Sequence, residues 1–205
     1  MQARFTTDEI AAAALRIVDE SGVGGLSMRS LAAALGTGPM TLYNYVADKE
    51  GLEELVVAAI VAEVKLPETT GDWQQDCYAI ASAMWRGIRS HPAAIPLVLT
   101  RRMSSSTGFM AAEALISALG RASLDDRDRL AAFHALLGFV TGSAQADLAG
   151  PLVAARIGNV AGDDYPNVEA LSRVAADTTV EDDFDRGLRM LIDGIASHRR
   201  VRRRR

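Results

Sequence analysis

A short run of polar side chains near the N-terminus has the chemistry to contact nucleic acid. Thr41, Tyr43, Asn44 and Tyr45 together supply a hydroxyl, an amide and two phenols. Such groups donate and accept hydrogen bonds at base edges and phosphates, whereas a helix face that only meets water usually carries paired charges. We therefore interpret this run as the outer face of a DNA-reading element.

Capping and turn residues around this run predict the elements that position it. Ser27 is a natural N-cap for a helix that Gly36 ends, because glycine adopts the left-handed conformation without a steric penalty. Thr37 is expected to cap a second short helix with Pro39 in its first turn, and Asp48 is expected to cap a third. This pattern is typical of a helix-turn-helix, although the spacing alone fits any small helical bundle equally well.

The same stretch resembles the N-terminal domain of the tetracycline-repressor (TetR) family. The resemblance lies in the run TLYNYVADKEGL from Thr41 to Leu52, preceded by Leu31-Ala32 and Leu35-Gly36. It implies an all-α fold, in which a three-helix helix-turn-helix domain precedes a larger C-terminal helical bundle for regulation and dimerisation. The chain departs from the common family pattern at residues 38–40, where Gly-Pro-Met replaces a polar residue and a glycine.

Composition also predicts an all-helical protein. Hydrophobic residues make up 49% of the 205 residues and aromatic residues only 5%, so alanine and the aliphatic residues must build the core. We expect a DNA-binding domain at residues 1–50, a ligand-binding and dimerisation domain at 51–198, and a basic tail at 199–205. Periodicity and helix breakers predict helices at residues 6–21, 49–66, 72–89, 93–102, 108–119, 124–149, 166–176 and 180–197, and an irregular stretch at 150–166. Thr6 and Glu9 have the spacing of a capping box, and further N-caps are expected at Thr107, Ser123 and Thr179.

The resemblance further implies which residues contact a double-stranded DNA operator. Phosphate contacts are expected from Tyr43 and Lys49, and the other members are expected near base edges and the adjoining backbone. The full predicted set is Arg29, Thr37, Gly38, Pro39, Thr41, Tyr43, Asn44, Tyr45 and Lys49. The net charge of −4 excludes a generic polycation, so affinity must come from a few focused contacts that dimerisation doubles.

The C-terminal arginine run is the strongest concentration of charge in the chain. We interpret residues 199–205 as a disordered, solvated tail that complements the negative end of the last helix. Contact with DNA phosphates or with RNA is the alternative.

Two helices carry wide apolar stripes that suit a homodimer. The segment from Phe184 to Ile195 resembles the final helix of the TetR-type regulatory domain, which pairs with a long earlier helix across a twofold axis. Glycines in the long helix allow another backbone to approach closely. The predicted interface is Leu130, Leu137, Gly138, Phe184, Leu188, Leu191 and Ile195. The alternative is that both are ordinary core helices.

The regulatory domain contains few candidate ligand-binding groups. An apolar pocket for a small, hydrophobic effector is predicted from aromatic residues, methionine and a few polar groups, each of which could equally be core. The set is Trp85, Met103, Phe109, His134, Phe139 and Gln145. His134 lies beside Phe133 and is expected either to meet a ligand or to be a satisfied core residue.

Several classes of function have little support in the sequence. Cys77 is alone, so no intramolecular disulfide forms, and no signal peptide or membrane span is visible, which favours a cytoplasmic protein. No metal-ligand spacing and no nucleophile motif occurs, so neither a metal, a cofactor nor an enzymatic activity is expected. The sequence therefore favours a ligand-responsive repressor that binds a near-palindromic operator as a dimer. A helical enzyme or carrier, or a scaffold protein, is the alternative.

Overall fold

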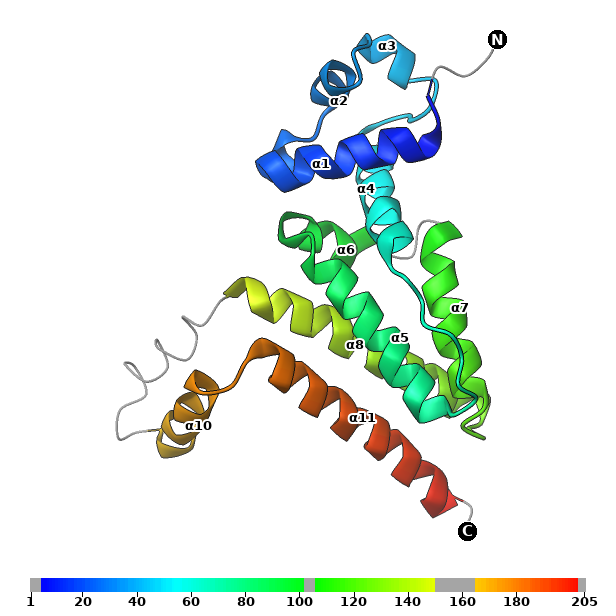
Figure 1. Ribbon diagram of the computed structural model, residues 1–205, viewed down its shortest axis with the longest axis vertical. Coiled ribbons are helices and arrows are strands. Elements are labelled where there is room, and N and C mark those ends of the chain that lie inside the picture. Colours follow the sequence, from blue (N-terminus) through cyan, green and yellow to red (C-terminus); the bar gives the residue numbers. More distant parts are fainter. Residues whose placement is uncertain (1–4, 102–105, 150–164, 203–205) are drawn as a thin grey trace.

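The computed structural model describes residues 5–101, 106–149 and 165–202 of the chain. Every regular element within these ranges is a helix, so the predicted all-α fold is confirmed. Figure 1 shows an elongated molecule in which the N-terminal helices form a head, one helix leads out of it, and the remaining helices form a longer body. No described helix is long and apolar enough to cross a membrane.

The head consists of three helices: α1 (Thr7–Gly25), α2 (Met28–Ala34) and α3 (Pro39–Leu42). The predicted capping box at the start of α1 is confirmed, since Thr6 and Glu9 exchange hydrogen bonds. Ser27 caps α2 as predicted, and it forms a second capping box with Ser30. Helix α1 is longer than predicted because the chain bends at Gly22, with a φ of 70°, and then continues for one more turn.

The turn between α2 and α3 differs from the prediction at its cap. Gly36 has a φ of 61°, in the left-handed region, as expected for a glycine that ends a helix. The N-cap of α3 is Gly38 rather than Thr37, and it offers no side chain to the helix. Pro39 occupies the first turn as predicted, because its fixed φ suits that position.

Helix α4 (Lys49–Glu63) leads from the head into the body. Asp48 caps it as predicted, accepting a hydrogen bond from the Gly51 amide at 2.9 Å. The helix ends at Glu63, three residues earlier than expected, and an extended segment leads to α5. Helix α1 packs along α4, and the apolar side of α4 is buried between the head and the body.

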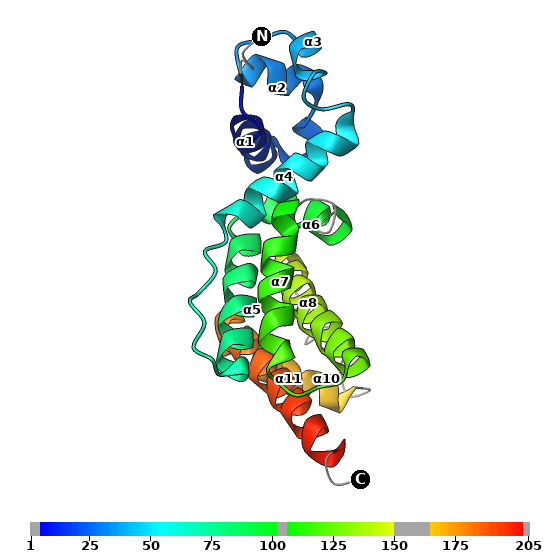
Figure 2. The ribbon, with the colours of Figure 1, turned by 90° about the vertical axis from the view of Figure 1, so that its right-hand side faces the viewer.

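The body is built on α5 (Trp73–Arg89), η1 (Pro92–Ala94), α6 (Ile95–Arg101), α7 (Ser106–Gly120), α8 (Asp126–Ala149) and α11 (Val180–Arg202). Helices α5, α7 and α8 pack against one another, and α11 covers α5 and α8 (Figure 2). The predicted cap Thr179 is confirmed, since its hydroxyl accepts from the Asp182 amide at 3.0 Å.

Three predicted helix boundaries in the body are corrected. Thr107 lies inside α7, which begins at Ser106, and Ser123 occupies a turn with a φ of 55° before α8. Asp125 caps α8 instead, because its carboxylate accepts from the Asp128 amide. Helix α11 continues to Arg202, so part of the predicted disordered tail is helical.

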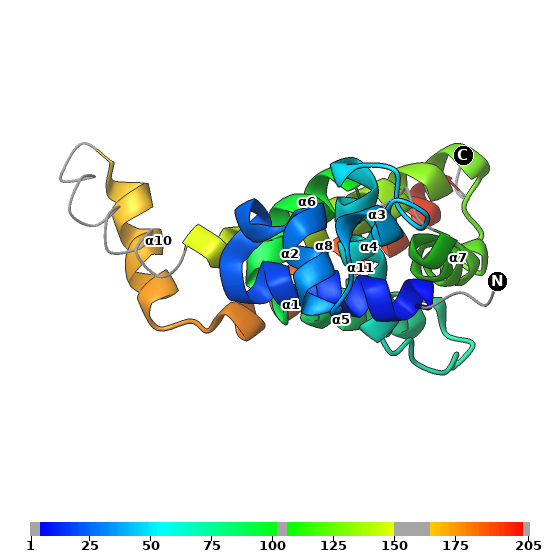
Figure 3. The ribbon, with the colours of Figure 1, turned by 90° about the horizontal axis from the view of Figure 1, so that it is seen from above.

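Helix α10 (Pro166–Ala176) stands away from the body, as Figures 1 and 3 show. No residue of α10 is buried in the isolated chain. Most of the predicted irregular stretch from Gly150 to Pro166 lies outside the described residues.

A buried acid fastens the extended segment after α4 to the body. Asp76 is 3% exposed and accepts hydrogen bonds from the Thr69 hydroxyl at 2.7 Å and from the Thr70 amide at 2.8 Å. The guanidinium of Arg121, the first residue after α7, also donates to it. Burial works to raise the pKa of Asp76, but these hydrogen bonds and the arginine charge outweigh it and hold the pKa well below its usual range.

Candidate nucleic-acid interface and ligand pocket

The segment from Pro39 to Val46 forms the outermost surface of the head. Leu42 and Val46 are 0% and 6% exposed and anchor the segment in the core. Tyr45 and Val46 both donate backbone hydrogen bonds to the Leu42 carbonyl, so the chain continues as a turn after the short α3. The helix is shorter than the predicted recognition helix, and Asn44 and Tyr45 lie in this turn.

Most of the predicted DNA-contacting side chains lie on the exposed surface of the head. Thr37 and Thr41 are half-buried at the same end of the head. The exposed members are Arg29, Gly38, Pro39, Tyr43, Asn44 and Lys49. These exposed side chains are therefore accessible to a partner on the head.

Tyr45 is oriented differently from the prediction. Its ring meets the Phe5 ring edge-on with centroids 6.4 Å apart, and its hydroxyl accepts a hydrogen bond from the Phe5 amide at 3.2 Å. The phenol therefore fastens the N-terminal residue of the described chain to the head. Because this hydrogen bond occupies the Tyr45 hydroxyl within the head, we do not expect Tyr45 to contact bases.

Met40 is an exposed residue that the predicted contact set lacks. It occupies the first turn of α3, and 77% of it is exposed, next to Tyr43 at 50%. A long apolar side chain gains nothing from water at this position. The departure from the family pattern at residues 38–40 was the signal that could have identified it.

Lys49 keeps its ammonium available at the edge of the same surface. Its side chain is 59% exposed, and Nζ lies 4.0 Å from Glu53 Oε1, the limit for an ion pair. Glu53 is also contacted by Arg101 Nε of α6 at 3.3 Å. Because the nearby carboxylate already has an arginine, Lys49 can bind a phosphate at little cost.

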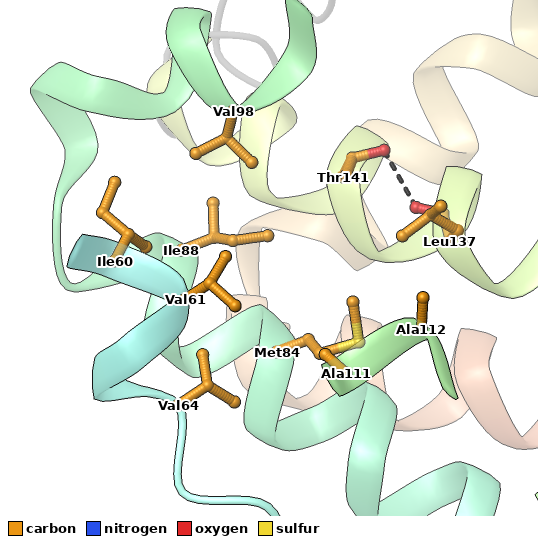
Figure 4. A pocket seen from close by; sticks show the side chains of 10 residues that line it. All are labelled: Ile60, Val61, Val64, Met84, Ile88, Val98, Ala111, Ala112, Leu137 and Thr141. Atoms are coloured by element: carbon orange, nitrogen blue, oxygen red, sulfur yellow. Dashed lines mark hydrogen bonds between the residues drawn. The ribbon is translucent and has the colours of Figure 1, made fainter. Parts of the chain in front are cut away.

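A narrow apolar cavity lies where α4 enters the body (Figure 4). Its volume of about 50 Å³ is far below the ~300–1,000 Å³ of typical small-molecule pockets. Side chains from α4, α5, α6, α7 and α8 form its walls: Ile60, Val61, Val64, Met84, Ile88, Val98, Ala111, Ala112, Leu137 and Thr141.

Among the described residues that line the cavity, Thr141 supplies the one hydroxyl and the others are apolar. The Thr141 hydroxyl donates to the Leu137 carbonyl of its own helix at 2.9 Å, which Figure 4 shows as a dashed line. None of the described residues that line the cavity is charged. Transferring a charge into such a site costs free energy because the described lining offers no opposite charge to pair with it. The cavity therefore suits uncharged, largely apolar molecules.

Of the six predicted ligand-binding residues, the five that the structure describes do not line this cavity. Trp85 is buried on another face of α5, stacked on Phe184 at 4.0 Å, and Phe139 stacks on the same ring at 5.4 Å. Phe109 is 54% exposed, and His134 and Gln145 are also exposed. Met103 lies outside the described residues.

The angular position of each residue on α8 explains why His134 does not line the cavity. Each residue turns an α-helix by about 100°, so His134 points away from the buried stripe that contains Phe133. The stripe continues through Leu137 and Thr141, which reach the cavity instead. Identifying these wall residues requires the packing of five helices, and no local pattern reveals it.

The predicted dimer residues divide into two groups. Phe184 and Leu188 are buried within the chain, 5% and 0% exposed, and Leu137 lines the cavity. These three therefore stabilise the body itself. Leu130 and Gly138 of α8 are exposed, and Leu191 and Ile195 of α11 are half-buried beside a surface groove between α8 and α11.

Little else in the described part of the chain offers reactive chemistry. Burial raises the pKa of the Cys77 thiol to about 12, so it stays protonated. Within the described ranges, no group of three histidine, cysteine or acidic side chains is placed to hold a metal ion.

Two family models match the chain. Residues 10–56 match the bacterial regulatory proteins of the tetR family, and residues 66–199 match the tetracyclin repressor-like C-terminal domain. The first match covers most of the head and the first half of α4, and the second covers the body.

Individual relatives agree with these matches. The chain is 34% identical over 144 residues to an HTH-type transcriptional regulator of Saccharopolyspora erythraea, and 31% identical over 146 residues to the HTH-type transcriptional repressor DrrR1 of Streptomyces coeruleorubidus. Each alignment covers 70% of this chain but only 61% and 54% of the relative. The chain thus spans little more than half the length of these two relatives.

A solved structure matches nearly the whole chain. The TetR family protein ActR of Streptomyces coelicolor, in complex with (S)-DNPA, superposes with a TM-score of 0.81 at 25% identity. The match covers 96% of this chain and all of that one. From its two matched domains and this shared architecture, the chain belongs to the tetracycline-repressor (TetR) family of bacterial regulatory proteins.

Proposed function

We propose that the protein is a transcriptional repressor that binds a near-palindromic DNA operator as a homodimer and leaves it when a small molecule binds. The observation that carries this proposal is the position of α4. The helix begins beside the reading surface, at Lys49, and its last turn supplies Ile60 and Val61 to the apolar cavity. A molecule in the cavity therefore contacts the helix that carries the head.

The small cavity volume suggests how release occurs. A molecule of ordinary effector size needs several times the space that the walls leave. Its binding must separate α4 from α5 and α6, and a tilt of α4 moves the head attached to it. Two heads in a dimer then no longer match successive major grooves, and the population shifts away from the DNA-bound arrangement.

The cavity also limits the class of effector. Its described lining residues carry no charge, and the Thr141 hydroxyl among them already donates to its own helix. We infer an uncharged, mostly apolar effector. We expect no metal, no cofactor and no enzymatic activity. The protein would act in the cytoplasm, with domains at residues 1–50 and 51–198.

The proposal is tested by selecting binding sites from a pool of random double-stranded DNA with the full-length protein. We expect a near-palindromic consensus, and release of that DNA by uncharged apolar compounds but not by charged analogues of equal size. Recovery of no consensus from repeated selections would overturn the proposal.

Asn44 and Lys49 are expected to play different roles on the selected operator. Replacing Lys49 with alanine removes a phosphate contact, so all sequences should weaken about equally and the slope of log affinity against log salt should fall by about 1 per head. Replacing Asn44 with alanine should instead change base preference, by ~1–3 kcal/mol at one position of each half-site. Binding measured across an operator library distinguishes the two. Equal behaviour of the two variants would contradict this division.

Met40 is expected to contact a thymine methyl group. The exposed thioether side chain at the start of α3 can pack on the C5-methyl of thymine in the major groove. Replacing single thymines of the operator with uracil removes only that methyl. Replacing one thymine of each half-site should lower the affinity of wild type about threefold, which is the size expected for one apolar contact. The same replacement should leave the affinity of Met40→Ala unchanged. The same loss in both proteins would contradict the contact.

A further inference from the structure

His91 lies between the two halves of the molecule and forms hydrogen bonds to both. Its Nδ1 is 2.9 Å from Asp19 Oδ2 on α1, and its Nε2 is 2.9 Å from Glu63 Oε2 at the end of α4. The residue itself caps η1, between α5 and α6, and its side chain is 12% exposed. One imidazole thus joins the head, the connecting helix and the corner of the body.

The geometry assigns a charge to this histidine. A carboxylate only accepts hydrogen bonds, and a neutral imidazole carries a single N–H. Two bonds of 2.9 Å to two carboxylates therefore require the imidazolium form, with one N–H for each partner. Burial lowers the pKa of His91, but the hydrogen bonds and charges of Glu63 and Asp19 outweigh it, and the pKa is raised above its ordinary value.

His91, Asp19 and Glu63 together form what we call the clamp, which adjoins the apolar cavity. Glu63 stands between Val61 and Val64, which both line the cavity, and His91 follows Ile88, another wall residue, by three positions. Separation of α4 from the end of α5 therefore pulls Glu63 away from His91. The remaining bond to Asp19 lies on α1, so the same movement alters how the head is held.

We propose that His91 is a positioning residue that couples the apolar cavity to the reading head, by holding Asp19 and Glu63 together in the DNA-binding arrangement. The clamp itself is inferred from the hydrogen bonds of His91 and does not depend on the proposed function. Its effect on DNA rests on the proposed function above.

The charged side chains on the helices that pack around His91 have identified partners. Asp19 and Glu63 are the two groups whose charges act on it. On α5, Arg89 pairs with Glu181 of α11. On α6, Arg101 pairs with Glu50 and Glu53 of α4.

The raised pKa fixes the direction of the pH effect. A group whose folded pKa exceeds its unfolded value adds stability that is fully present below the unfolded pKa, ~6.5 for histidine. That stability is lost as the pH rises through the folded pKa. The clamp should therefore be intact in mildly acidic solution and open in alkaline solution, and the head should loosen accordingly.

The first experiment follows the imidazole resonances of His91 by NMR during a pH titration of the full-length protein. We expect a pKa above the ordinary value in wild type, and a lower one in both Asp19→Asn and Glu63→Gln. Glu20→Gln is the matched control, since it removes a negative charge from the neighbouring exposed position of α1. An ordinary or lowered pKa in wild type, or an equal shift in Glu20→Gln, would overturn the clamp.

The second experiment measures hydrogen exchange of the α1 amides, corrected for the intrinsic effect of pH. Protection in wild type should fall about tenfold between mildly acidic and alkaline solution, as one charge-assisted bond is lost. His91→Gln should show at every pH the low protection that wild type shows in alkaline solution. His91→Arg should show at every pH the high protection of wild type in acidic solution, because arginine is a permanent cation with donors for both carboxylates. Identical pH profiles in wild type and His91→Gln would contradict the proposal.

Measurements of operator affinity distinguish a failure of the proposed coupling from a failure of the proposed function. With DNA from the selection, wild type should bind several-fold more weakly in alkaline than in mildly acidic solution, whereas His91→Gln should bind weakly throughout. Wild-type binding that follows the His91→Gln profile overturns the coupling. Absence of any sequence-specific binding by wild type overturns the proposed function, and the NMR titration still decides the clamp.

Discussion

Replacing Asp76 with alanine is expected to lower the free energy of unfolding by about 1.5–3 kcal/mol, the range for hydrogen bonds to a charged group, because Arg121 is 37% exposed and is hydrated once its partner is gone. The carboxylate holds Thr69, Thr70 and Arg121 at once, so its loss frees the segment between α4 and α5 from the body. Urea unfolding followed by circular dichroism measures the effect. Asp126→Ala is the matched control, because Asp126 is 92% exposed and pairs with Arg129 on the same helix.

The same residue predicts an acid limit to stability. The pKa of Asp76 is lowered by its partners, so its contribution is present above the unfolded pKa of about 3.9 and is lost as the pH falls below that value. The alanine variant should show a flatter decline of stability in acid than wild type. Equal stability of variant and wild type at neutral pH would contradict the role assigned to this network.

Placing arginine at Gly138 is expected to abolish dimerisation and to weaken operator binding by more than about a hundredfold, because one head makes only half of the contacts. Gly138 is exposed on α8, and a Cβ built there meets no atom within 4 Å in the isolated chain. The substitution should therefore leave the fold of each chain intact while placing a charge in the proposed interface.

Sedimentation and operator titration measure this second prediction. Glu113→Arg, at an exposed position of α7, introduces the same side chain away from the proposed interface. It should remain a dimer and bind the operator like wild type. A Gly138→Arg protein that stays dimeric would place the twofold axis elsewhere.

Local signals in the sequence were sufficient for the elements but not for their mutual contacts. Thr6, Ser27 and Asp48 cap helices as predicted, because a capping hydrogen bond spans only two or three residues. The cap of α3 was mispredicted because Thr37 and Gly38 are both acceptable cap residues, and Pro39 fits the first helical position directly after Gly38.

The cavity and the clamp depend on residues far apart in the chain. His91 bonds to partners 72 and 28 positions away, and no spacing rule links them. The aromatic residues Trp85 and Phe139 suggested a pocket. Both pack on Phe184 of α11, and Trp85 also lines a surface pocket between α5 and α11. Burial of an aromatic side chain is common to cores and pockets, so residue type alone could not separate the two.

The spacing of the two operator half-sites tests the central claim most directly. A dimer with heads held by α4 on one body should read half-sites that face the same side of the duplex. Inserting about 5 base pairs between the half-sites turns one of them by half a helical turn. We expect affinity for the selected operator to fall to that for random DNA. Unchanged affinity would mean that the heads bind independently, and the account of a repressor controlled through head spacing would be wrong.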